Sequence, residues 1–214
     1  MITERVDTLA NGKRTHQVAR LVSNLLHPWL VLAVIIALTA YSAAGHNGEW
    51  VKWTLLALFL AYLPSIIYAG IRTALLRRAE GNDNSNLLLL RERPRDLLVT
   101  ALLFGFPAVS ALYILGAPQE ILTVVIAAAA TMLIIALVNL KYRASFHIAL
   151  LTWALFSLWS LAGAVSLVTI LLVPLLGLSR YRLSEHTANQ LIIGFALGLA
   201  ITPAVFHVFR ITGV

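Results

Sequence analysis

Long apolar runs separated by short polar segments form the pattern of this chain. Runs of about 20 residues recur, and a helix of that length crosses the hydrocarbon layer of a bilayer. Because the backbone must satisfy its own hydrogen bonds inside lipid, helices are the expected secondary structure. The runs predict helices over residues 29–44, 53–76, 97–115, 120–140 and 188–209.

The apolar run over residues 146–178 is too long for one span. As a single helix it would extend about 50 Å, whereas the hydrocarbon layer is about 30 Å thick. Two short helices that break near Gly163 fit this run better, so the sequence predicts a hairpin here.

The hairpin decides which polar segments share a side of the membrane. With it, the segments that contain Arg93, His147 and His186 all emerge on the same side, whereas a single helix would separate the last two. The prediction is an all-α, polytopic transmembrane helix bundle of six or seven spans, in a single domain over residues 1–214.

Charge indicates which side this is. All lysines and arginines except Lys52 and Arg210 fall on the side of the three polar segments. The positive-inside rule then makes residues 1–20 a cytoplasmic tail and gives the polar segments a cytoplasmic position in a multi-pass cell (inner) membrane protein.

Composition agrees with a membrane protein. Hydrophobic residues make up 60% of the chain and charged residues 12%, against about 25% charged residues in soluble domains. The net charge of +7 indicates contact with anionic lipid headgroups, not nucleic acid. The chain has no cysteine, which excludes disulfides and thiolate chemistry.

Three short motifs lie in the polar segments. They are Arg93-Pro94, then Ala144-Ser145-Phe146-His147, then Ser179-Arg180 followed by His186. Together they resemble the signature of the type 2 phosphatidic acid phosphatase superfamily, whose pattern is Lys-x-x-x-x-x-x-Arg-Pro, Pro-Ser-Gly-His and Ser-Arg-x-x-x-x-x-His-x-x-x-Asp. The resemblance covers residues 86–198, which form the phosphatase-like core.

The chain departs from that pattern in each motif. The lysine falls on Asn86, the proline and glycine fall on Ala144 and Phe146, and the aspartate falls on Gln190. Gln190 follows His186 by four residues, so the two share a face if the last helix begins by residue 187. Its carbonyl can still accept an N–H, so we expect the histidine to keep its orientation and lose the support of a negative charge.

The resemblance implies a metal-independent reaction without a cofactor. A phosphoryl group in transfer needs fixed cations and N–H donors, and an arginine offers a planar bidentate fork to phosphate. The family's roles make His186 the nucleophile that forms a phosphohistidine and His147 the general acid for the leaving group. The candidate site is catalytic His186, His147 and Gln190, with phosphate-binding Arg93, Arg180, Ser145 and Ser179.

Structural interpretations account for the other polar and small residues. We interpret His16, His27, His46 and His207 as polar caps or packing residues, and Gly194 with Gly198 as a helix-packing face. Arginines at cytoplasmic helix ends are typically topology signals, and we assign this role to Arg77, Arg78, Arg95, Arg143 and Arg182.

The predicted function is an integral membrane lipid phosphatase acting on a lipid phosphate or prenyl diphosphate. The partners are therefore the lipid phosphate substrate and membrane lipids. Two alternatives stay open: a lipid phosphotransferase on the same scaffold, and a lipid-phosphate binder or transporter whose catalytic site has decayed. The losses at Asn86 and Gln190 favour the second alternative, and the intact spacing from Arg180 to His186 opposes it.

Overall fold

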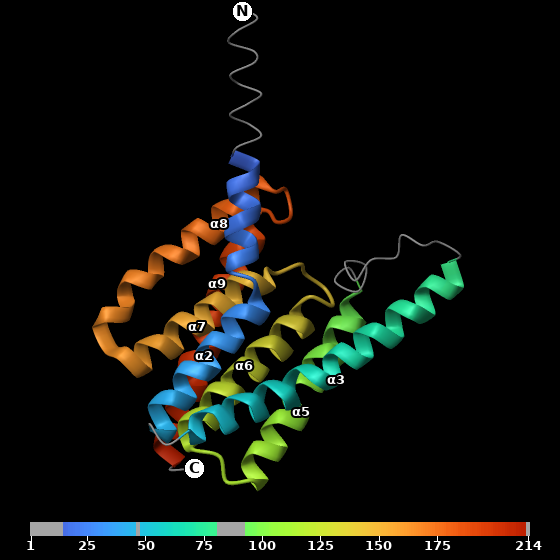
Figure 1. Ribbon diagram of the computed structural model, residues 1–214. Helices are drawn as coiled ribbons and strands as arrows, with labels where there is room; N and C mark the ends of the chain where they lie inside the picture. The colour runs from blue at the N-terminus through green and yellow to red at the C-terminus, as the bar shows by residue number, and fades with distance from the viewer. Residues whose placement is uncertain (1–14, 46–47, 81–92, 213–214) are drawn as a thin grey trace, which may run out of the picture.

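A computed structural model describes residues 15–45, 48–80 and 93–212 of the chain (Figure 1). The predicted tail up to residue 14 and Asn86 lie outside the described residues. In the described part of the chain, the elements after an N-terminal helix (Thr15–Leu25) are α2 (Pro28–Ala44), α3 (Glu49–Glu80), α5 (Pro94–Ile114), α6 (Gln119–Val138), α7 (Phe146–Ala162), the 3₁₀ helix η1 (Gly163–Leu171), α8 (Leu172–Arg182) and α9 (Ala188–Thr212).

Several of these helices can cross a membrane. Four described helices are long and apolar enough: Glu49–Arg78, Pro94–Ile114, Gln119–Val138 and Ala188–Phe209. The N-terminal helix and α2 add a fifth if the pair, bent by 41°, is one span. Helix α7 is apolar but has 17 residues. The all-helical membrane bundle is therefore confirmed, whereas six or seven spans are not.

Helix α3 extends beyond the predicted range 53–76 at both ends. Glu49 lies in its first turn, and Arg77 and Arg78 lie in its last turn. Each charge opposes the helix dipole at its own end, which stabilises the added turns. Charged residues that we excluded from the apolar run therefore belong to the helix.

The predicted break of the long apolar run is confirmed at Gly163. Helix α7 ends at Ala162, and Gly163 has a φ of 63°, a left-handed conformation that glycine adopts without steric penalty. The chain then returns through η1 and α8, and Figure 1 shows α7 and α8 as the two arms of a hairpin. The backbone N–H of Ser145 donates to the carbonyl of Gln190 at 2.9 Å, so α7 and α9 begin at the same end of the bundle.

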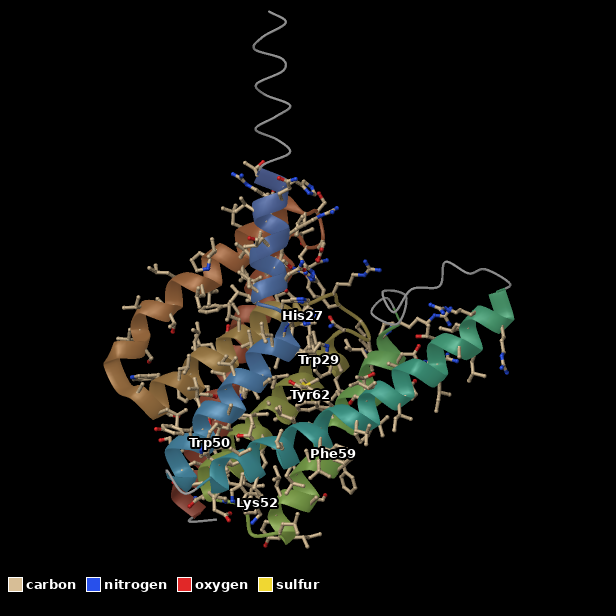
Figure 2. The ribbon with its side chains drawn as sticks, viewed as in Figure 1. His27, Trp29, Trp50, Lys52, Phe59 and Tyr62 are labelled. Carbon is tan, nitrogen blue, oxygen red and sulfur yellow. The ribbon has the colours of Figure 1, made fainter. Side chains whose placement is uncertain are left out.

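The core lies between α2, α3, α5, α6 and α7. Trp153 and Phe104 are fully buried in it, and the Trp153 indole N–H donates to the carbonyl of Val124. Near the start of α2, the Tyr62 hydroxyl donates to the carbonyl of Trp29 and the two rings pack edge to face (Figure 2). This packing fixes where α2 begins, and with it the bend that leads to the N-terminal helix.

Candidate functional site

Five of the predicted site positions meet at one end of the bundle, in a closed series of contacts joined by short stretches of chain, which we call the site ring. The ring runs from Ser145 through Gln190, His186, Glu185, Arg180, Ser23 and His27 to His147, which is two residues from Ser145. It joins four segments of the chain: the N-terminal helix, the start of α7, the end of α8 and the start of α9. The predicted hairpin is what brings these segments together.

Backbone atoms hold the crossing of α7 and α9. The hydrogen bond from Ser145 to Gln190 is one close backbone contact. A second lies at Gly194, where an added Cβ would be only 2.4 Å from the carbonyl oxygen of Ser145. One turn further, a Cβ of Gly198 would lie 2.6 Å from the carbonyl oxygen of Ala149. The expected packing role of these glycines is confirmed. Glycine is needed at both positions because the two backbones approach too closely for a side chain to fit between them.

Gln190 sets the orientation of His186. Helix α9 begins at Ala188, one residue later than a shared helical face requires, but the side chains still meet, with His186 Nδ1 at 3.1 Å from Gln190 Oε1. Gln190 Oε1 also accepts the backbone N–H of Thr187 at 3.2 Å, the geometry of a capping box. The Thr187 N–H can only donate, so the Gln190 atom that faces it is the oxygen. The same oxygen is the partner of His186 Nδ1, and because an oxygen of this kind only accepts, Nδ1 must carry the proton. The neutral ring then carries its lone pair on Nε2.

The turn between α8 and α9 explains the spacing from Arg180 to His186. The N–H of Ser184 donates to the carbonyl of Tyr181, and the N–H of Glu185 donates to that of Arg180, which is the Schellman pattern of a helix end. Ser184 takes the left-handed position with a φ of 56°. This turn places Glu185 beside Arg180, and the two side chains form an ion pair.

Arg180 is buried and both ends of its guanidinium are held. Nη2 pairs with Glu185, and Nη1 donates to the Oγ of Ser23 at 3.0 Å. The Arg180 side chain is 6% exposed and the Glu185 side chain 41%. A phosphate that binds Arg180 would therefore have to compete with the Glu185 carboxylate.

Ser145 and His147 occupy the amino end of α7. Ser145 is the N-cap residue, and its hydroxyl is fully buried with no hydrogen-bond partner within the described residues. His147 is also buried, and its ring packs edge to face against that of His27, with 5.7 Å between centroids. The dipole of this helix end favours an anion.

Two other predicted phosphate ligands lie differently. The hydroxyl of Ser179 donates to the carbonyl of Leu175 within α8, so it would have to rotate to reach a phosphate. Arg93 is exposed at the start of α5, which packs against α3 and α6, and it is not a member of the site ring. Lys141, Arg143 and Arg182 are exposed, as residues with a topological role would be.

Sequence reasoning missed two polar residues that hold local structure, one beside the site ring and one at the start of α5. Asn139 Oδ1 accepts the N–H of Ala144 at 2.6 Å and so fixes the loop before Ser145. Asp96 is buried in the first turn of α5, where its Oδ1 accepts the Tyr68 hydroxyl at 2.6 Å and Arg72 Nε at 3.1 Å. An acidic residue in an otherwise apolar helix was the available signal for Asp96.

An apolar cleft of about 200 Å³ begins beside the site ring. Leu25 and Leu26 of the N-terminal segment line its upper end, next to His27, and Leu151 lies one turn after His147. The cleft follows α2 as far as Ile35, about 10 Å from the start of this helix, or a third of the hydrocarbon layer. The larger surface groove runs along α3 past Phe59 and Tyr62 (Figure 2), away from the ring.

Metal ligands do not gather in the described part of the chain: no three histidines, aspartates or glutamates there are placed to share an ion.

The comparisons with known proteins add no family. No protein-family model matches the chain, and neither the curated proteins nor the solved structures contain a match. The assignment to the phosphatase superfamily therefore stays a prediction that rests on the motif residues.

Proposed function

We propose that this protein is an integral membrane phosphatase that removes phosphate from a lipid phosphate or prenyl diphosphate. The observation that carries the proposal is the site ring, in which His186, His147 and the buried Arg180 come from three segments and meet at one end of the bundle. Each has the chemistry that one step of phosphoryl transfer needs.

The reaction follows from these positions. Arg180 and the amino end of α7 neutralise charge on the phosphoryl oxygens. His186, held through Nδ1 by Gln190, attacks phosphorus with the lone pair of Nε2, and the bond to the lipid oxygen breaks. His147 donates its proton to that leaving oxygen. Water then attacks the phosphohistidine, His147 takes a proton from the water, and inorganic phosphate leaves.

The apolar cleft supports a lipid substrate. A charged head bound at Arg180 would leave its hydrocarbon chain beside Leu26 and Leu151, at the mouth of the cleft. Along α2 the cleft extends about 10 Å, most of the depth of one leaflet, so the head-proximal part of an acyl or prenyl chain of the same leaflet can enter it.

The proposal includes six or seven spans with the site on the cytoplasmic face. Helix α7 is about 26 Å long, and η1 with α8 rises about 34 Å, so the hairpin can cross the hydrocarbon layer twice. Because the chain lacks cysteine, single cysteines test this directly. Lys141→Cys should react with an impermeant maleimide only from the cytoplasm and Lys52→Cys only from the opposite side; labelling of both from one side would overturn the topology.

Phosphate release tests the function. The purified protein in detergent is assayed on phosphatidic acid, phosphatidylglycerol phosphate and a prenyl diphosphate. We expect release from at least one, its loss in His186→Ala, and wild-type rates in His207→Ala, an exposed histidine on the same helix. Equal release by His186→Ala would refute the mechanism. Binding of a lipid phosphate without turnover would favour a decayed binder, the alternative that the neutral Gln190 supports. Transfer of phosphate to an added alcohol would favour a phosphotransferase.

A further inference from the structure

The N-terminal segment contributes two side chains to the site ring, although it lies outside all three motifs: Ser23 belongs to the helix Thr15–Leu25, and His27 is the N-cap residue of α2. Ser23 accepts the hydrogen bond from Arg180 Nη1, and His27 packs against the ring of His147. Backbone hydrogen bonds from Leu26 to Val22 and from His27 to Asn24 continue the helical turn past residue 25. Ser23 and His27 are thus one turn apart and face the same side (Figure 2 labels His27).

We propose that this N-terminal segment is a working part of the phosphate site, with Ser23 and His27 as positioning residues for Arg180 and His147. The inference rests on the proposed function and adds residues that the motifs do not contain. It replaces our interpretation of His27 as a simple polar cap.

The environment of Ser23 supports a polar role. The N-terminal helix turns Ala19 and Ser23 toward the protein, where both are buried, and leaves Val18, Leu21 and Leu25 exposed. An alanine would fill the space of Ser23 equally well. The hydroxyl adds an acceptor, and the guanidinium of Arg180 uses it at 3.0 Å. With Glu185 on the other terminal nitrogen, this contact fixes the plane of the guanidinium and so the direction of its remaining N–H groups.

The contact of His27 acts on the general acid. The two imidazoles are nearly perpendicular, at 88°, so one ring presents its edge to the face of the other. Rotation of His147 about its side-chain bonds would break this arrangement. His27 therefore restricts the directions in which His147 can deliver a proton.

Variants of Ser23 test the first half of the inference. Ser23→Ala should weaken binding of inorganic phosphate about three- to tenfold, measured by calorimetry and as competitive inhibition, because the Arg180 guanidinium loses the hydroxyl that holds Nη1. Ser23→Thr keeps the hydroxyl and should restore the affinity. Asn24→Ala, an exposed neighbour, is the matched control. Unchanged affinity in Ser23→Ala, or no rescue by threonine, would overturn the role of Ser23.

A leaving-group comparison tests the second half. An alkyl phosphate needs a proton on its leaving oxygen, whereas p-nitrophenolate leaves without one. Both substrates share the later hydrolysis of the phosphohistidine, so the comparison uses kcat/KM, which covers the steps up to loss of the leaving group. His27→Gln should lower kcat/KM about tenfold or more on an alkyl phosphate and less than about twofold on p-nitrophenyl phosphate. The same change at the exposed His16 should alter neither rate. Equal losses on both substrates would mean a structural role for His27 and overturn this half.

The proposed function and the inference about Ser23 and His27 can be refuted separately. If the wild-type protein hydrolyses no phosphate ester, the proposed function fails, and the phosphate affinities of Ser23→Ala and Ser23→Thr still decide whether the helix orients Arg180. If the wild type is active and the variants behave like their controls, the phosphatase stands and the inference fails.

Discussion

Replacement of Gly194 by alanine is the sharpest perturbation of the site that avoids its chemical groups. At Gly194, α9 meets the backbone of Ser145 with no side chain between them. An added Cβ would lie 2.4 Å from the carbonyl oxygen of Ser145 and 3.2 Å from its carbonyl carbon. These are backbone atoms at the start of a helix, so they cannot rotate away as a side chain would.

The size of the effect follows from these distances. A Cβ contact below 3.0 Å is not tolerated, so the two backbones must separate by at least 0.6 Å (3.0 minus 2.4). Overpacking of this kind costs about 1–3 kcal/mol of stability. The same shift stretches the 2.9 Å hydrogen bond from Ser145 to Gln190. Because the Gln190 side chain orients His186, the histidine moves with it. Misplacement of a reacting group by about 1 Å can lower a rate about 100-fold, so we expect the rate of phosphate release to fall by one to two orders of magnitude in protein that is still folded.

The assay compares thermal unfolding in detergent with phosphate release. Gly177→Ala is the matched control, because a Cβ there would meet only Ile148 and Leu191 side chains at 3.9 and 4.0 Å, an ordinary packing distance. We expect Gly177→Ala to keep both stability and rate. Wild-type turnover by Gly194→Ala would refute the reasoning, since the close crossing of α7 and α9 would then not be what assembles the site.

Three further substitutions have defined outcomes. Ser184→Gly should raise the free energy of unfolding by up to about 1 kcal/mol without loss of activity, because glycine removes the left-handed strain at φ 56°; a loss of stability would contradict this. Asp96→Asn should lower that free energy by about 1.5–3 kcal/mol, since it removes the charge that pairs with Arg72, and an unchanged melting temperature would count against the buried pair. Gln190→Glu keeps the acceptor of the capping box and adds a negative charge beside His186, so kcat should rise about fivefold in steady-state assays; a lower kcat would contradict the expected charge support.

The hairpin and the positions of most helices were predictable because their signals are local. A glycine inside an apolar run longer than a bilayer marks the break at Gly163, and apolar length alone locates most helices. The meeting of His186 with Gln190 was predictable as well, but for a different reason from the one expected. A shared helical face would require an earlier start of α9, whereas the capping box from Thr187 to Gln190 needs only the observed start.

The partners of Arg180 and Asp96 were not predictable in the same way. Ser23 and Arg180 are 157 positions apart in the sequence, and a serine in a polar amino-terminal segment carries no signal for a buried contact. Asp96 offered a signal, but its hydrogen-bond partners Tyr68 and Arg72 lie on α3. No periodicity in α3 or α5 indicates which faces of these two helices meet. Such contacts depend on how helices pack, which apolar patterning in lipid constrains weakly.

The central claim is that His186 carries the phosphoryl group, and single-turnover trapping tests it most directly. The protein is mixed with less than one equivalent of a ³²P-labelled lipid phosphate or prenyl diphosphate, quenched in alkali, which preserves phosphohistidine, and analysed for the position of the label. We predict label on His186 in the wild type and none in His186→Ala. Turnover by the wild type with label on another residue, or with no labelled protein at any quench time, would contradict the claim.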